Sequence, residues 1–321
     1  MAVPKNKPKK DRDFEDAEVG VDNSERSFKK YALGARKRTA VLKIHPREPV
    51  GGMMLDIGKL EKDKVQTQLD HALGKAGFYS AAFILQRVLA DELDVDPEEI
   101  EVASMMRRKA GADEWVGEIV LVDRLANGSG FVRYLAENLP DVLDKCLDIE
   151  SLSAFAKNTI LNQDHAKDCA TACPQCLLNY YNSAFHGLLD WRLGMMILRA
   201  IRNPGYRCGL NDESVLKAAP EFRGTLEVSK KAAQLLKASS NGSLEILHND
   251  RLPVLFKYER KDKQPILVGM SPGMWSRDAH VHSAWLGEYI AEHNPANWEV
   301  RWTDLFNVLR QPTQALKALE G

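Results

Sequence analysis

The 321-residue sequence has no hydrophobic run that approaches the ~20 apolar residues of a membrane-spanning helix. Its first residues, MAVPKNKPKKDRD, are charged and contain no apolar segment of the kind found in secretory signals. The sequence also lacks a G-x-x-x-x-G-K-[ST] phosphate-binding loop and a DEAD or DEAH box, so it shows no motif of an ATP-driven motor. We therefore expect a cytoplasmic protein without a membrane partner, and one that is not itself an ATP-hydrolysing enzyme.

A strong net charge is absent as well, because the formal net charge is -1 although 28% of the residues are charged. This balance excludes a uniformly basic nucleic-acid binder but leaves room for a local basic surface. The chain has only five cysteines. In a cytosolic protein, cysteines that cluster indicate metal binding or catalysis rather than a disulfide framework.

Residues 1–30 are predicted to be a disordered charged tail, because they are polar and contain too little apolar surface to offset the loss of chain entropy. The tail carries five early basic residues, which can contact nucleic acid or simply be solvated: Lys5, Lys7, Lys9, Lys10 and Arg12. The length of the chain suggests two domains or one large one. We expect a first domain at residues 31–209 and a second at 210–321.

The first domain is expected to be α/β, a mixed sheet with packed helices. RTAVLKI at 38–44 alternates as a strand does, and residues 77–93 carry apolar side chains at helical spacing. Asp96 and Pro97 predict the start of a short helical turn. Strands are expected within 100–110 and at Glu118–Asp123, the second of them central in the sheet because it is almost wholly apolar.

A glycine-rich loop, Asn127 to Gly130, follows this apolar strand and precedes a helix that carries Phe131, Leu135 and Leu139 on one face. Backbone N–H groups at a helix N-terminus bind anions. The loop, with Gly128, Ser129 and Gly130, is therefore either a purely structural turn or a contact for a phosphate backbone.

Three cysteines, Cys169, Cys173 and Cys176, lie within eight residues. Their spacing allows the thiolates to converge on one zinc ion, which takes four sulfur or imidazole ligands in a tetrahedron. The candidates for the fourth ligand are, in order, His165, His186 and Cys146. CPQC also allows a redox pair, and three unrelated buried thiols are the remaining alternative.

A core helix follows the cysteines, with Leu189, Leu193, Ile197 and Ile201 at every fourth position. Trp191 and Arg192 at its start are either a surface that stacks on or clamps nucleic acid, or a core-edge tryptophan beside an ion-pairing arginine. The basic run Arg107, Arg108 and Lys109 also suits a phosphate backbone.

The second domain, residues 210–321, alternates between strand-like and helix-like patterns and is predicted to be a small α/β domain. Such a domain raises the alternative of a metal-dependent nuclease, for which the sequence shows no established motif. The acids and ligands that it would use are Glu245, Asp250, His280 and Asp304, with His280 and His282 as an alternate-residue pair.

DCATACPQCLLNYYNSAFHGLLDWRLG at 168–194 resembles the signature of the MrfA-like zinc-binding domain, found at the C-terminal end of DEAD/DEAH-box helicases of DNA repair and phage defence. The resemblance extends to RTAVLKI, to IVLVDRLANGSGFVRYL at 119–135 and to VRWTDLFNVLRQP at 300–312. It implies that Cys169, Cys173 and Cys176 bind a structural zinc ion (Zn2+).

The resemblance further implies an accessory subunit of a separate DEAD/DEAH-box helicase that assists the binding of nucleic acid, most naturally DNA. The residues expected to touch nucleic acid are Arg107, Arg108, Lys109, Gly128, Ser129, Gly130 and Arg192. Two other functions remain open, the metal-dependent nuclease and a protein–protein scaffold with structural zinc.

Overall fold

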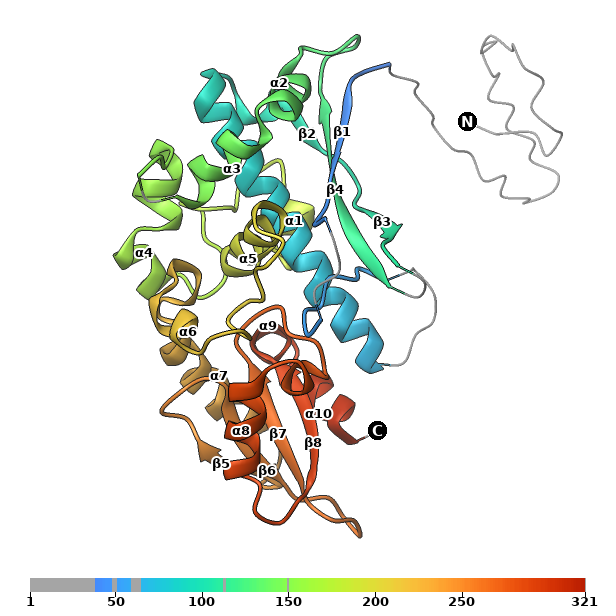
Figure 1. Ribbon diagram of the computed structural model, residues 1–321, viewed down its shortest axis with the longest axis vertical. Helices are drawn as coiled ribbons and strands as arrows, with labels where there is room; N and C mark the ends of the chain where they lie inside the picture. The colour runs from blue at the N-terminus through green and yellow to red at the C-terminus, as the bar shows by residue number, and fades with distance from the viewer. Residues whose placement is uncertain (1–37, 48–50, 59–64, 112–113, 149, 321) are drawn as a thin grey trace, which may run out of the picture. The chain divides into compact units, whose positions relative to one another are not determined.

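The computed structural model describes residues 38–47, 51–58, 65–111, 114–148 and 150–320 (Figure 1). From Thr39 onward the chain forms one compact unit with two β-sheets and packed helices, so the predicted α/β fold class is confirmed. The predicted charged tail, residues 1–30, lies outside the described residues. Within the described ranges, none of the helices is long and apolar enough to cross a membrane.

The first sheet is built around the strand β4 (Trp115–Asp123), which is buried along most of its length. It pairs antiparallel with β1 (Val41–Ile44) on one edge. On the other edge it pairs with β2 (Ile100–Val102) and β3 (Met106–Lys109). The apolar pattern thus predicted correctly that β4 is central, although the strand begins three residues earlier than Glu118. A short 3-10 turn (Pro97–Glu99) precedes β2, and Asp96 caps it as predicted.

Two long helices form the centre of the first core. Helix α1 (Val65–Leu93) buries the predicted apolar face, and its Phe78, Leu85 and Leu89 are fully buried. Helix α5 (Trp191–Arg202) packs along α1 (Figure 1). Gly194 of α5 lies against the α1 backbone, where an added Cβ would come within 2.8 Å of the carbonyl carbon of Ser80. The glycine therefore permits the close approach of the two helices.

Shorter helices surround this pair. The single helix expected from Phe131 to Leu139 is two helices, α2 (Phe131–Glu137) and α3 (Leu139–Leu147), separated by Asn138. Pro140 explains the difference, because it has no N–H for a continuing helix but is tolerated in the first turn of a new one. A π-helical turn (Ala156–Ile160) and α4 (Gln163–Asp168) follow α3. After α5 come α6 (Ser214–Ala218) and a 3-10 turn (Pro220–Phe222).

The second sheet has the order β5 (Leu244–His248), β6 (Val254–Tyr258), β7 (Ile266–Ser271), β8 (Glu299–Asp304). The first two pairings are antiparallel, and β7 pairs parallel with β8 through a crossover that contains a 3-10 turn (Ala279–Val281) and α8 (Ala284–Glu292). The chain ends with α9 (Leu305–Arg310) and α10 (Pro312–Glu320). Strand β6 and the helix α7 (Thr225–Ser239) were not expected from the sequence.

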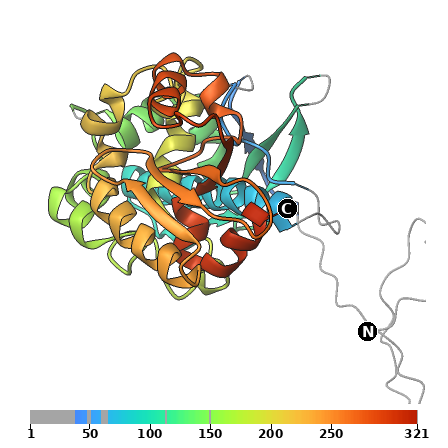
Figure 2. The ribbon, with the colours of Figure 1, turned by 90° about the horizontal axis from the view of Figure 1, so that it is seen from below.

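The second sheet separates two hydrophobic cores. Leu255 and Leu267 join the first core together with residues of α8, whereas Val254, Phe256 and Val268 belong to a second core with α7, α9 and α10. In Figure 2, α8 lies on one side of these strands, and α7 and the C-terminal helices lie on the other. The first core draws side chains from both predicted domains. The boundary at residues 209 and 210 stays a prediction.

Candidate metal centre

Four side chains converge at the end of helix α4. His165 lies in α4, Cys169 is its C-cap, and Cys173 and Cys176 lie in the following loop. The four ligand atoms all lie within 4.8 Å of one another, and of these residues only Cys173 is not buried. Sequence spacing alone had ranked His165 first among the candidates for a fourth ligand.

Two of the distances between ligand atoms match the edges of a zinc tetrahedron. The sulfur atoms of Cys169 and Cys176 are 3.9 Å apart, and the Cys173 sulfur is 3.6 Å from Nε2 of His165. Zinc–sulfur bonds of about 2.3 Å and zinc–nitrogen bonds of about 2.0–2.1 Å place sulfurs about 3.8 Å apart and sulfur and nitrogen about 3.6 Å apart in a tetrahedron. The donor set, three sulfurs and one imidazole nitrogen, therefore fits zinc in both its chemistry and its spacing.

The protein environment supports the sulfur atoms. The backbone N–H of Cys173 donates to the sulfur of Cys176 over 3.1 Å, as amides do toward metal-bound thiolates. The hydrogen bond with Cys169, followed by burial, raises the pKa of Cys176 to about 12. A cation at the centre of the group is what makes thiolates favourable in such a buried place. In the part of the chain that the structure describes, Nδ1 of His165 is a buried atom without a hydrogen-bond partner.

The other two candidate ligands lie elsewhere. Nε2 of His186 lies 2.9 Å from the carbonyl oxygen of Asn179 and 3.0 Å from Oδ1 of Asn182, so it holds the loop that follows Cys176. Cys146 is fully buried in α3, and desolvation raises the pKa of its thiol strongly. The structure thus brings His165 to the cysteines and places His186 and Cys146 outside the group of four.

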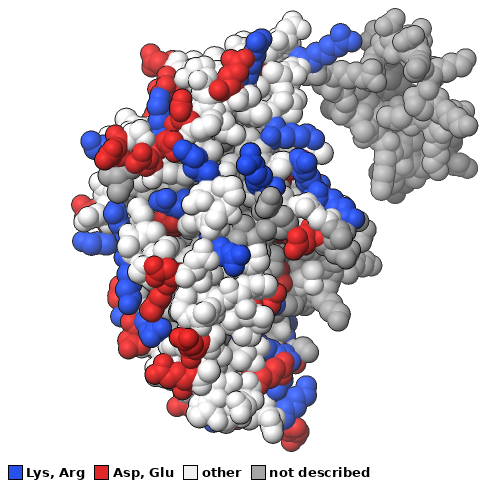
Figure 3. All heavy atoms as spheres, in the orientation of Figure 1, with Lys and Arg blue, Asp and Glu red and all other residues white. Residues whose placement is uncertain are grey.

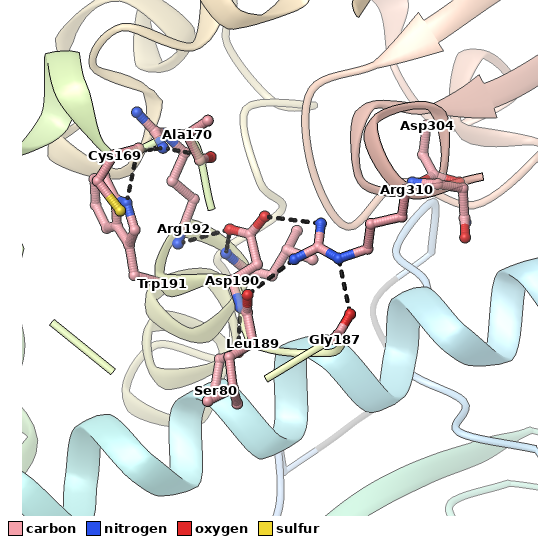
Figure 4. A network of polar contacts seen from close by, with 12 residues as sticks. Ser80, Cys169, Ala170, Gly187, Leu189, Asp190, Trp191, Arg192, Asp304 and Arg310 are labelled. Carbon is pink, nitrogen blue, oxygen red and sulfur yellow. Dashed lines mark hydrogen bonds and ion pairs between the residues drawn. The ribbon is translucent and has the colours of Figure 1, made fainter. Parts of the chain in front are cut away.

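Arg192 and Trp191, at the start of α5, hold the backbone of the metal loop (Figure 4). Nη1 of Arg192 donates to the carbonyl oxygens of Cys169 and Ala170 over 2.7 and 2.9 Å, and Nη2 donates to Ala166 and Arg223 over 2.7 and 2.9 Å. The indole N–H of Trp191 donates to the same Cys169 oxygen over 3.2 Å. Trp191 is fully buried and Arg192 is 3% exposed.

The predicted nucleic-acid contact of Arg192 is therefore wrong. Its guanidinium lies inside the protein, and four backbone carbonyls use the donors that a phosphate would need. Burial lowers the pKa of Arg192, but an arginine stays charged at any pH at which the protein is folded. The alternative interpretation, an arginine engaged within the structure, is closer to the observed role.

Asp190 connects Arg192 to Arg310 of the C-terminal helix α9 (Figure 4). Its carboxylate caps α5 by accepting from the backbone N–H groups of Arg192 and Leu193. Its other oxygen lies 4.0 Å from Nη1 of Arg310 in α9, and Arg310 also donates to the carbonyl oxygens of Gly187 and Leu189 over 2.8 and 2.9 Å. Burial raises the pKa of Asp190, and the two arginines oppose that shift. Arg310 thus holds the segment that leads into α5, through Gly187 and Leu189.

The basic run on β3 is divided between two roles. Arg107 forms a bidentate ion pair with Asp56, with Nε 2.6 Å from Oδ1 and Nη2 2.5 Å from Oδ2. Its guanidinium carbon lies 4.2 Å from the centre of the Trp115 ring. Arg108 and Lys109 are exposed, and Arg108 lies 2.5 Å from Nε2 of His45. Figure 3 shows Lys and Arg side chains gathered near β3. Arg108 and Lys109 are therefore accessible to a phosphate, and Arg107 is engaged with Asp56.

The glycine-rich loop is bound by the protein's own carboxylate. Asp123, fully buried at the end of β4, accepts from the N–H of Gly130 over 2.8 Å and from that of Val132 over 3.0 Å. Gly128 and Gly130 have φ of 80° and 88°, the left-handed region that favours glycine. Ser129 lies between them and is half-buried. An anion at these amides would have to displace Asp123, so the geometry favours the structural turn.

The residues named for a nuclease do not converge. Asp304 caps α9 and is buried, His280 accepts from the indole N–H of Trp302, and His282 pairs with Asp278. Glu245 and Asp250 are exposed. Among the residues that the structure describes, the group of three or more His, Cys, Asp or Glu with converging ligand atoms is the one at His165.

One surface feature beside the cysteines was not expected from the sequence. Tyr180 and Tyr181 are 85% and 67% exposed, and their rings lie edge to face with centroids 5.4 Å apart. The pair YY follows Cys176 closely in the sequence, and its exposure is a tertiary property that no periodic pattern reveals.

Comparison with known proteins places the metal group within a known domain. Residues 81–177 match the family model of the MrfA Zn-binding domain, and all four converging side chains lie in this range. The chain is also 25% identical over 203 residues to the Druantia protein DruE of Escherichia coli (strain UMEA 4076-1). That match covers 63% of this chain but only 10% of the relative. No solved structure matches the chain significantly. The match of residues 81–177 to the MrfA Zn-binding domain model, together with the four converging ligands, confirms the family resemblance and the zinc cofactor expected from the sequence.

Proposed function

We propose that this protein is a zinc-binding, non-motor subunit that helps a separate DEAD/DEAH-box helicase to hold nucleic acid. One observation carries the proposal: one histidine and three cysteines whose ligand atoms lie within 4.8 Å of one another are inside the segment that matches the MrfA Zn-binding domain. The ligands in this proposal are His165, Cys169, Cys173 and Cys176. Zinc supplies a cross-link here, because four protein ligands leave no open position for a substrate.

The zinc site organises the surroundings of α5. The loop that it closes is held from the other side by Arg192 and Trp191, and the start of α5 is held by Arg310 of α9. Binding of the metal and folding of this loop are therefore expected to be coupled. In this proposal the ion stabilises a rigid platform and takes no part in a chemical step.

Two arguments support the helicase partner. The matched relative, DruE, is far longer, and the chain spans about a tenth of it. The sequence of this chain shows no Walker A or DEAD/DEAH motif. We propose that a DEAD/DEAH-box motor acts together with the residues of this sequence. The occurrence of such domains in phage-defence helicases, together with the match to a Druantia protein, favours a defence role over DNA repair.

The exposed side chains of Arg108 and Lys109 support DNA as the ligand. They lie on β3 among other basic side chains (Figure 3). Contacts between lysine or arginine and phosphates release counterions and make binding fall with salt. The net charge of the chain is near zero, so such binding depends on this local surface rather than on the whole molecule.

The test is binding of a fluorescent dT20 strand and of a 20-base-pair duplex at several salt concentrations. The variant R108E/K109E is compared with K231E/K237E, which makes the same change of net charge on the exposed face of α7. We expect only the first variant to weaken binding and to reduce the salt slope by about 1–2. No binding by the wild type would overturn the nucleic-acid role. Magnesium-dependent cleavage of the strands would favour the nuclease alternative instead.

The helicase itself is tested by affinity purification from the native host with identification of the co-purifying proteins. A DEAD/DEAH-box helicase that binds the wild type is the expected result. Its absence, with zinc still bound to the protein, would favour a scaffold for other partners. We also propose that residues 31–209 and 210–321 are two domains packed within the compact unit, a division that the second core behind the C-terminal sheet supports.

A further inference from the structure

Tyr180 and Tyr181 form an aromatic tip on the loop that leaves the metal site. In most folded proteins two neighbouring tyrosines bury part of their rings, yet these rings are 85% and 67% exposed. They are nearly perpendicular, with an interplanar angle of 88°. Together the two rings present aromatic surface in two directions.

The loop below the tip is rigid. Asn179 and Asn182 exchange hydrogen bonds, each backbone N–H donating to the other side chain's Oδ1 over 3.0 and 2.9 Å. Asn182 is 2% exposed, and its Nδ2 donates to the carbonyl oxygen of Leu177 over 2.7 Å. Nε2 of His186 contacts the carbonyl oxygen of Asn179 and Oδ1 of Asn182. The chain therefore presents the tyrosines in a fixed position, at little further entropic cost to a ligand.

The base of the tip is anchored to the centre of the fold. Phe185 packs against Tyr79 of α1 with ring centroids 4.6 Å apart. The hydroxyl of Tyr79 accepts from the N–H of Met105, which directly precedes β3. One side chain of α1 thus links the loop that carries the tip to the start of the strand that carries Arg108 and Lys109.

The charged side chains beside the tip sum to a small negative charge. The hydrogen bond of Tyr181 with Glu98 raises the pKa of the tyrosine hydroxyl. The same glutamate pairs with Arg124 over 2.9 Å, and Leu125, next in the chain, is 57% exposed. Asp96 adds a nearby negative charge. Ligand binding at the tip is therefore governed by contact with the rings rather than by a strong local potential.

We propose that Tyr180 and Tyr181 are a stacking site for the bases of single-stranded nucleic acid, an inference that rests on the proposed function and names where that ligand binds. Every base has a π-face, and stacking on an exposed aromatic ring needs no sequence and little charge. Two perpendicular rings suit bases that are splayed apart, as in a single strand, and cannot reach bases stacked within a duplex. The phosphates are neutralised elsewhere, by the basic side chains on β3.

Site-directed variants separate stacking from other contacts. The zinc-loaded full chain is titrated into fluorescein-labelled dT20 and into a 20-base-pair duplex. Y180A/Y181A removes both rings, and Y180F/Y181F keeps the rings but removes the hydroxyls. Val281→Ala is the matched control, because Val281 is another apolar side chain, 73% exposed, at a distant position in the sequence. Melting temperature and zinc content confirm that each variant is folded.

We expect Y180A/Y181A to lose about 10- to 100-fold in affinity for dT20, with an unchanged salt slope, because stacking involves no counterions. The phenylalanine variant and the valine control should bind as the wild type does, and duplex affinity should not change. A wild type that binds no strand would overturn the proposed function and this inference together. Wild-type binding that Y180A/Y181A leaves intact would overturn this inference alone and favour a protein contact. An equal loss in the phenylalanine variant would overturn stacking.

Discussion

Nη1 of Arg192 donates a hydrogen bond of 2.7 Å to the carbonyl oxygen of Cys169, the residue where helix α4 ends and the metal loop begins. This contact joins a buried positive charge to the backbone of a cysteine that we assign to zinc. Three thiolates and one divalent cation leave one negative charge in excess. Arg192 compensates this charge in the interior, where an uncompensated ion is costly.

Replacing Arg192 by methionine should therefore weaken zinc binding. We expect about a 10- to 100-fold lower affinity, as for other residues that support metal ligands from outside the coordination sphere. Competition with a chromophoric zinc chelator measures the change. R202M is the control on the same helix, because Arg202 pairs with Asp144 near the surface and should have almost no effect. Equal zinc affinities of the two variants would contradict the charge argument.

His165 and His186 can be distinguished by substitution. H165N and C173S should each abolish stoichiometric zinc and lower the melting temperature strongly, because metal binding and folding are coupled. H186N should keep its zinc, since the imidazole of His186 contacts Asn179 and Asn182 rather than the sulfurs. Metal analysis by mass spectrometry reads the stoichiometry. C146A is the matched cysteine control, and zinc loss in C146A or H186N would refute the proposed ligand set.

Cysteine spacing predicted the metal group well because the ligands are local in sequence. Cys169, Cys173 and Cys176 lie within one loop, so few backbone conformations are needed to bring them together. The role of Arg192 was mispredicted because its partners are distant in the sequence. Its partners include carbonyls at Ala166 and Arg223, and a helical pattern does not say which charged residue faces a neighbouring loop.

The same distinction holds for the fold. The central strand β4 follows from its continuous apolar run, and the helices α1 and α5 follow from apolar side chains at helical spacing. Strand β6 was not expected because it has only five residues, and a short apolar run does not by itself distinguish a buried strand from part of a buried helix. The exposure of Tyr180 and Tyr181 is likewise decided by tertiary packing. Aromatic residues are usually assigned to a core unless a structure shows their surroundings.

Gly194 should be intolerant of even one added carbon. A Cβ at this position would come within 2.8 Å of the Ser80 carbonyl carbon and 2.9 Å of the Ala81 nitrogen, both in the backbone of α1. We expect G194A to lower the free energy of unfolding by about 1–3 kcal/mol, the usual cost of overpacking a core. Chemical denaturation measures it. Gly187→Ala is the control, because nothing lies within 4 Å of the added carbon there. Equal free energies of unfolding of the two variants would contradict this prediction, because they would show that α1 and α5 can move apart to accommodate the added carbon.

Asp304 should make the protein less stable as the pH rises through weakly acidic values. Burial raises the pKa of this carboxyl from 3.8 to about 6, although Asn307 and Arg277 favour its charged form. Between about pH 4 and pH 6 the folded state keeps a proton that the unfolded chain has released. Stability from this group is therefore greatest below pH 4, falls as the pH rises, and stays low above pH 6.

The variant D304N removes this titration and keeps an oxygen that can cap α9. Relative to the wild type, its free energy of unfolding should rise by about 2 kcal/mol between pH 4 and pH 7, since each unit of pKa shift corresponds to about 1.4 kcal/mol and part of the shift is already expressed at pH 4. Urea denaturation at a series of pH values gives the difference. Any loss of metal at low pH affects both proteins and cancels. D278N is the control with the opposite shift, because the Ser276 hydrogen bond lowers the pKa of Asp278 below 3.8. This carboxyl is ionised in both the folded and the unfolded state above about pH 4, so the D278N difference should stay nearly constant between pH 4 and pH 7. A D304N difference that does not change with pH would show that residue 304 is already ionised in the folded protein at pH 4.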